Sequence, residues 1–179
     1  TVDYLGAERY GMWMAISSLI AVLSFADLGI GNGLVNSIAE ANGRDDRAAA
    51  IRYVSNAFYM LVGIALLIVA LSLAIYPFVP WPQIFKINSE LAIAELGPSI
   101  LLLLFCFVVN IPLSLVERIR IGYQEGFVNS LWQALGSVSG LLLVLVAIRF
   151  KAGLPSLVLA MAGAPVVATA GNALHQFYR

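Results

Sequence analysis

Residues 11–33 read GMWMAISSLIAVLSFADLGIGNG, and this stretch decides the class of fold. Its apolar part has about 20 residues, the length at which an α-helix crosses the hydrocarbon core of a bilayer. Asp27 lies near the end of that part, where a carboxylate is costly enough to indicate a function. Gly29, Gly31 and Gly33 follow and weaken a regular helix at the same place. The stretch therefore predicts a transporter helix that lines a cavity rather than a plain membrane anchor.

The composition of the whole chain supports a membrane protein. Of its 179 residues, 61% are hydrophobic and only 11% are charged, whereas soluble domains carry about 25% charged residues. Membrane lipids are therefore the expected surroundings. The formal net charge is +0, so we expect no nucleic-acid partner, because proteins that bind nucleic acids carry basic stripes. No catalytic triad, metal-ligand set or carboxylate pair can be assembled from the sequence, so we expect no enzyme, no cofactor and no metal.

About five segments of the chain are long and apolar enough to span a membrane. They lie at residues 10–30, 50–76, 98–119, 127–150 and 154–177. They predict a single all-α transmembrane domain over residues 1–179, with antiparallel neighbours because the connections are short. We expect the first span to continue as an amphipathic extension to about Glu40. We expect the third to carry Pro98 in its first turn, after a short surface helix near Ser89.

The basic residues predict which ends of the spans face the cytoplasm. Six of them fall on one side of the expected topology and four on the other, and the richer side is usually cytoplasmic. The six are Arg44, Arg47, Arg52, Arg118, Arg120 and Arg179, and the four are Arg9, Lys86, Arg149 and Lys151. The loop at residues 43–47 is therefore expected in the cytoplasm, and the chain is expected to enter its first span from outside.

Each expected span has one face of small and polar residues at the i, i+4, i+7 spacing, through which helices pack in lipid. These faces predict that the helices form a bundle. Pro112 and Pro165 are expected to kink the third and fifth spans and to act as hinges. The faces are Ser17, Ala21, Ser24, Asp27 or Leu28, and Gly31 in the first span, Arg52, Asn56, Tyr59 and Gly63 in the second, Cys106, Asn110, Ser114 and Glu117 in the third, Asn129, Gln133, Gly136 and Gly140 in the fourth, and Ala160, Ala164, Ala168, Asn172 and His175 in the fifth.

Polar side chains gather in the expected cytoplasmic half of the spans, while the outer halves hold Leu, Ile and Val. This distribution predicts a polar cavity open toward the cytoplasm. The alternative is snorkelling and interhelical hydrogen bonding near the membrane interface. The expected substrate or ion pathway comprises Asp27, Asn32, Asn36, Arg52, Asn56, Asn110, Glu117, Arg118, Arg120, Gln124, Asn129, Gln133, Asn172 and His175.

The carboxylate and glycines of the opening stretch have more than one interpretation. Asp27 either binds a coupling cation, pairs with Arg52 or Arg120, or caps a helix. The glycines of residues 29–33 are expected to form a hinge or a site of close packing. A phosphate-binding loop is disfavoured because no strand precedes them.

Two further groups are open to a structural or a functional interpretation. The turn that holds Glu117, Arg118, Arg120 and Glu125 is either a solvated loop with local ion pairs or a mouth for a pyrophosphate head group, which arginine binds well. His175 is expected at the interface rather than in a proton relay.

Three strings of the sequence carry a family resemblance. They are YLGAERYGMW at residues 4–13, DLGIGNGLVN at residues 27–36 and IGYQEGFVNSLW at residues 121–132. They resemble Wzx-type oligosaccharide flippases of the multidrug/oligosaccharidyl-lipid/polysaccharide exporter superfamily, and the similarity extends over essentially the whole chain. The resemblance implies a MATE-like fold of two pseudo-symmetric six-helix lobes that works by alternating access. This chain would be the second to sixth helices of the amino-terminal lobe.

The resemblance also implies a substrate and a location. The substrate would be an undecaprenyl-pyrophosphate-linked oligosaccharide, flipped to the outer leaflet of a bacterial or archaeal cytoplasmic membrane. The first helix and the second lobe would be partners outside this chain. Cationic cavities are typical of the family, whereas membrane-embedded basic residues are sparse here. The alternatives are a cation-coupled multidrug exporter of the same superfamily and a truncated, inactive membrane fragment.

Overall fold

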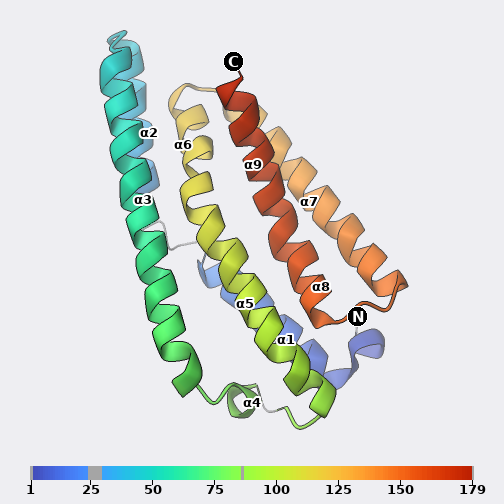
Figure 1. Ribbon diagram of the computed structural model, residues 1–179. Coiled ribbons are helices and arrows are strands. Elements are labelled where there is room, and N and C mark those ends of the chain that lie inside the picture. The colour runs from blue at the N-terminus through green and yellow to red at the C-terminus, as the bar shows by residue number, and fades with distance from the viewer. Residues whose placement is uncertain (1, 24–29, 86, 179) are drawn as a thin grey trace.

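The chain folds into a bundle of helices, shown in Figure 1. The computed structural model describes residues 2–23, 30–85 and 87–178, and within these ranges all regular secondary structure is helical. The all-α class expected from the sequence is therefore confirmed. In chain order the elements are α1 (Val2–Leu23), α2 (Ile30–Gly43), α3 (Arg47–Ile75), η1 (Tyr76–Phe78), α4 (Trp81–Ile84), α5 (Glu90–Leu113), α6 (Leu115–Gly122), α7 (Gly126–Arg149), α8 (Leu154–Val158), the π-helical turn η2 (Leu159–Gly163) and α9 (Ala164–Phe177).

Four helical segments of the described residues are long and apolar enough to cross a membrane, which makes the chain a multi-pass membrane protein. They are Arg47–Phe78, Glu90–Gly122, Gly126–Arg149 and Leu154–Gln176. Of the expected first span, residues 10–30, the structure describes residues 10–23 within α1 and Ile30 at the start of α2. Residues 24–29, with Asp27 and Gly29, lie outside the described residues. The expected amphipathic extension corresponds to α2.

The third span begins earlier than the sequence predicted. Ser89 is the N-cap of α5, and its Oγ accepts a hydrogen bond from the Ala92 N–H at 3.3 Å. The short surface helix expected near Ser89 is therefore the first turn of α5. Pro98 lies inside this helix rather than in its first turn. The serine cap fixes the helix start, and the helix continues through Pro98 at the cost of one backbone hydrogen bond.

The two other prolines of interest coincide with breaks in regular helix. Helix α5 ends one residue after Pro112, and α6 begins after Ser114. Pro165 lies in the first turn of α9, directly after the π-helical turn η2. Proline removes a backbone donor and crowds the preceding turn, and both effects favour such irregularities.

The connections between helices alternate between two ends of the molecule (Figure 1). The turns at residues 43–47 and 122–126 lie at the same end as the C-terminus, and we call this the turn end. The beginning of α1 and the connections at residues 76–85, 87–89 and 150–153 lie at the opposite end. The long helices are therefore antiparallel to their neighbours along the chain, as the short connections predicted.

Two apolar clusters join the helices. In one, Met12 of α1 packs with Leu96 of α5 and Leu154 of α8. In the other, Ile38 of α2 packs with Leu61 of α3 and with residues of α5 and α6. Helices α1 and α2 thus pack against different parts of the bundle. Helix α2 lies beside the half of α3 that is nearest the turn end (Figure 1).

The face of α3 that packs is not the face expected from the sequence. Ala57, Leu61 and Ala65 are buried on it. Small apolar residues let α2 and α5 approach without desolvating a polar group, which explains why this face is preferred. The expected face, which is exposed, consists of Arg52, Asn56, Tyr59 and Gly63.

The packing of α7 on α9 does follow the expected faces. A Cβ atom on Gly136 would lie 2.9 Å from the Ala168 Cβ atom, closer than side chains normally approach. One on Gly140 would lie 3.4 Å from the Ala164 Cβ atom. The two glycines therefore permit the close approach of these helices, and the prediction of a small-residue interface is confirmed here.

At the opposite end, charged residues of α1 hold the beginnings of α5 and α8. The Arg9 guanidinium lies 2.7 Å from the Glu95 carboxylate of α5. That carboxylate also accepts a hydrogen bond from the Leu154 N–H at the start of α8, at 3.2 Å. The neighbouring Glu8 carboxylate accepts a hydrogen bond from the Ser89 N–H at 3.1 Å. Anionic groups at helix N-termini are favourable, so these contacts fasten α1 to the bundle.

Candidate functional site

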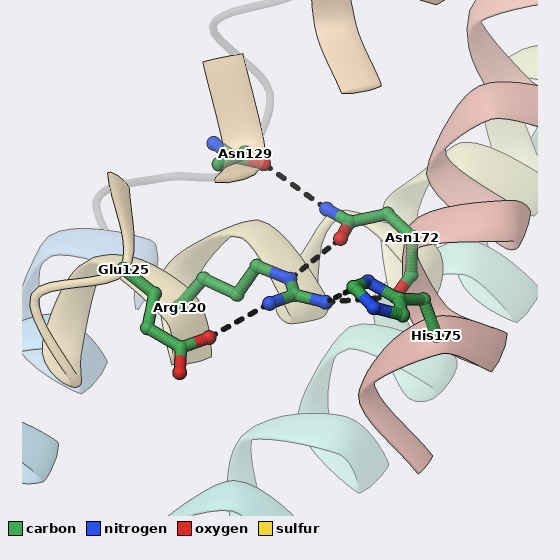
Figure 2. Close-up of polar contacts among 5 residues, drawn as sticks. All are labelled: Arg120, Glu125, Asn129, Asn172 and His175. Carbon is green, nitrogen blue, oxygen red and sulfur yellow. Dashed lines mark hydrogen bonds and ion pairs between the residues drawn. The ribbon is translucent and has the colours of Figure 1, made fainter. Parts of the chain in front are cut away.

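A buried arginine organises the turn end of the bundle. The side chain of Arg120, from α6, is completely buried. Its Nε donates a hydrogen bond to Asn172 Oδ1 at 2.5 Å, and its Nη1 donates to Glu125 Oε2 at 2.7 Å. Its Nη2 lies 3.1 Å from His175 Nδ1, which accepts because a guanidinium can only donate. Figure 2 shows these residues with Asn129, and we call the five the Arg120 cluster.

Asn172 of α9 connects the cluster across three helices. Its Oδ1 accepts from Arg120 of α6, and its Nδ2 donates to Asn129 Oδ1 of α7 at 3.2 Å (Figure 2). Asn129 and Asn172 are both buried. Both ends of the Asn172 amide are thus used, and the positive charge of Arg120 is paired with Glu125. The cluster fixes the positions of α6, α7 and α9 relative to one another.

A polar pocket of about 270 Å³ lies beside the cluster, between α5, α6, α7 and α9. We call it the amide pocket. Glu117 is the one charged residue among the described residues that line it. Gln133 Nε2 donates a hydrogen bond to Glu117 Oε2 at 3.3 Å. The lining residues are Asn110, Glu117, Trp132, Gln133, Ser137, Pro165, Ala168, Thr169 and Asn172.

One polar atom at the amide pocket lacks a partner. Asn110 Oδ1 is buried and makes no hydrogen bond within the described part of the chain. An unpaired buried acceptor costs free energy, and a hydroxyl group within reach would recover it. The pocket therefore offers hydrogen-bonding capacity that the protein does not use itself.

A larger pocket of about 570 Å³ opens at the turn end itself. Asp45, Asp46 and Arg47 from the α2–α3 turn line it, together with Glu125 and Gln176 from the other side. A mouth for a pyrophosphate group was one interpretation of the charged turn. As arranged here, the described lining of this mouth carries more acidic than basic groups, and Arg120 is not among the lining residues.

Most residues of the expected pathway fall into three groups. Asn110, Glu117, Gln133 and Asn172 meet at the amide pocket, and Asn172 also joins Arg120, Asn129 and His175 in the Arg120 cluster. The exposed residues, which reach neither place, are Asn32 and Asn36 on α2 and Arg52 and Asn56 on α3.

The remaining expected residues have other positions. Gln124 has a left-handed backbone with φ 64° and forms the α6–α7 turn. Arg118 is half-buried on α6 and takes part in an interaction of its own. Gly31 and Gly33 are helical residues of α2, so the helix break expected at the glycines does not fall on these two. Asp27 lies outside the described residues, so its pairing with an arginine stays a prediction.

Three lining residues were missed as site residues in the sequence. Ser137 lies four positions after Gln133, and Thr169 lies three before Asn172, so helical spacing places each on a face already singled out. Trp132 is adjacent to Gln133 and reaches the pocket because its ring is large. Extending the polar faces by one turn would have found the first two.

The fold and the site define a polytopic membrane protein with a polar pocket between its helices. Comparison of the sequence with known protein families, with curated proteins and with solved structures finds no match.

Proposed function

We propose that the chain forms part of a transporter that flips lipid-linked oligosaccharide or polysaccharide precursors across a bacterial or archaeal cytoplasmic membrane by alternating access. The amide pocket is the observation that carries the proposal. It gathers a carboxylate, amides and hydroxyl groups between helices that are long enough to span a membrane. Polar groups in such a place are costly and usually mark a substrate or ion pathway.

Two further observations support the proposal. The pocket lies toward the turn end, which the basic residues assign to the cytoplasm, where the precursors are expected to be made. The sequence strings that resemble Wzx-type flippases include Asn129 and Trp132. Asn129 belongs to the Arg120 cluster, and Trp132 lines the amide pocket. In the MATE-like arrangement of two lobes, the exposed polar face of α3 would be available to the second lobe.

Complementation tests this proposal. The complete gene product is expressed in a bacterial strain that lacks its own oligosaccharide flippase, and surface polysaccharide is measured. Restoration is expected, with a marked loss for Glu117→Ala and no loss for the control Glu40→Gln, which lies on exposed α2 surface. If the protein reaches the membrane and no polysaccharide is restored, the proposal is wrong.

Glu117 favours a second candidate, a cation-coupled multidrug exporter of the same superfamily. Its carboxylate is the one charged group in the described lining of the amide pocket. A carboxylate in such a place is suited to binding a cation. This candidate predicts that expression raises resistance to amphipathic cationic drugs in a manner that depends on a sodium or proton gradient. Unchanged resistance at verified expression would count against it.

A further inference from the structure

We infer that the amide pocket is a subsite for one uncharged sugar ring, which packs on Trp132 and is disfavoured when it carries an acid group. The inference rests on the proposed function, because it names the part of the lipid-linked substrate that this pocket would receive.

The size of the pocket limits its occupant to a single ring. Pockets for drug-sized ligands measure roughly 300–1,000 Å³, and the amide pocket measures about 270 Å³. An oligosaccharide does not fit in this volume, whereas one pyranose ring does. The remainder of the glycan would extend out of the pocket toward the turn end.

The hydrogen-bonding groups of the pocket favour ligands that donate. The Ser137 hydroxyl donates to the Gln133 carbonyl at 3.0 Å, and the Thr169 hydroxyl donates to the Pro165 carbonyl at 3.0 Å. Their lone pairs are left to accept. Asn110 lines the pocket, and its Oδ1 is a buried acceptor without a partner among the described residues. Sugar hydroxyls can donate to these atoms, whereas a phosphate or carboxylate oxygen cannot.

Trp132 supplies an apolar surface for the C–H face of a sugar ring. Trp132 lines the pocket, and its ring centroid lies 6.2 Å from that of His175. A Cβ atom on Gly171 would lie 2.6 Å from the indole. The absence of a side chain at Gly171 therefore leaves room for the ring at this position. Aromatic faces combine large contact area with a weakly negative surface that suits C–H groups.

Charge at the pocket discriminates against acidic sugars. Glu117 is the one charged residue in its described lining, and its basic neighbour along the chain, Arg118, is not among the lining residues. A carboxylate on the bound sugar would face the carboxylate of Glu117 at short range, and such like-charge contacts are strongly unfavourable. The pocket would therefore select neutral over acidic rings.

Binding of model glycosides to the protein in lipid nanodiscs tests the inference. Methyl α-glucoside, methyl α-glucuronide and inorganic pyrophosphate are titrated separately, and binding is followed by isothermal titration calorimetry. The neutral glycoside is expected to bind at least about tenfold more tightly than the glucuronide. Glu117→Gln should reduce this preference toward unity, and the matched control Glu40→Gln should keep it.

Substitutions of tryptophan test the role of the ring. Trp132→Leu should weaken binding of methyl α-glucoside about tenfold, and Trp132→Phe, which keeps an aromatic face, should retain most of it. Trp81→Leu, at the opposite end of the molecule, is the matched control and should bind like the wild type. Thermal unfolding of each variant shows whether a loss reflects unfolding rather than the missing ring.

Three outcomes would overturn the inference. They are no detectable binding of the neutral glycoside by the wild type, equal or tighter binding of the glucuronide or pyrophosphate, and unchanged binding in the folded Trp132→Leu variant. Binding and complementation are separate measurements, so the two proposals can fail separately. Complementation without glycoside binding would refute the subsite alone, and selective glycoside binding without complementation would refute the flippase function alone.

Discussion

The balance between burial and pairing at Arg120 governs the stability of the turn end. A charged group without exposure to solvent is tolerated only when its hydrogen bonds are satisfied. Arg120 meets this condition through Glu125, Asn172 and His175, which it contacts with three of its nitrogen atoms. Removing the guanidinium would take its charged donor away from both the Glu125 carboxylate and the buried Asn172 Oδ1.

We therefore expect Arg120→Ala to lower the free energy of unfolding by about 3 kcal/mol or more. Arg52→Ala, at an exposed position on α3, is the control and should change it by about 0.5 kcal/mol at most. Replacing both members of the pair, as in Arg120→Met with Glu125→Gln, should recover part of the lost free energy of unfolding, because neither charge then remains without the other. Chemical unfolding in detergent micelles measures all three. Equal stability of Arg120→Ala and the control would contradict the structural role of the cluster.

A second prediction at this scale concerns acid stability and Glu8. The hydrogen bond from the Ser89 N–H, helped by the Ser89 hydroxyl and the Asn88 N–H, holds the pKa of the Glu8 carboxyl below its ordinary value of 4.5. Because the folded pKa is the lower one, the stabilisation is present above the ordinary pKa and is lost as the pH falls through the folded value.

Thermal unfolding of the wild type and Glu8→Gln between about pH 7 and about pH 3 measures this contribution. The wild type should be more stable at neutral pH, and the difference should shrink as the carboxyl is protonated. The same series on Glu40→Gln, remote from α1, is the matched control. A difference that is independent of pH would show that Glu8 does not stabilise through its charge.

At the scale of the helices, the glycines of α7 allow a direct comparison of two sites. A Cβ atom on Gly136 would press on Ala168 of α9, whereas one on Gly63 of α3 would meet no atom within 4 Å. Alanine at an open helical position stabilises by up to about 1 kcal/mol. We expect Gly63→Ala to stabilise the protein slightly and Gly136→Ala to destabilise it by about 1–3 kcal/mol, as overpacked cores do. Thermal unfolding of both in the same micelles measures the contrast, and the same sign for both would refute it.

The α7–α9 interface also shows which features of the bundle the sequence can predict. Gly136 and Ala168 recur at helical spacing on two adjacent spans, so their contact follows from local pattern alone. Helix α3 carries two such faces, one polar and one of alanines, and spacing cannot decide which of them packs. The bond from Arg120 to Asn172 joins residues 52 positions apart. It depends on how three helices meet, which no local pattern encodes. The shared membrane depth of the polar residues predicted only that they lie in the same half of the bundle.

At the scale of the whole molecule, the alternating connections make the orientation in the membrane testable. The turns at residues 43–47 and 122–126 share one end, and the connection that contains Asn88 lies at the other (Figure 1). The excess of basic residues at the turn end predicts that this end faces the cytoplasm. A single-cysteine reporter at each end distinguishes the two orientations, since the native Cys106 is buried and should react slowly.

We expect a membrane-impermeant maleimide to label Asn88→Cys in intact cells and Asp45→Cys only in inverted membrane vesicles. Both positions are exposed in the structure, and the Asn88 side chain can change because only its backbone N–H contacts Glu8. The reverse pattern would place the amide pocket toward the outer leaflet, where a flippase would release its substrate rather than receive it. Because the glycoside-binding experiment is independent of orientation, the reversed result would change the proposed direction of transport and leave the sugar subsite intact.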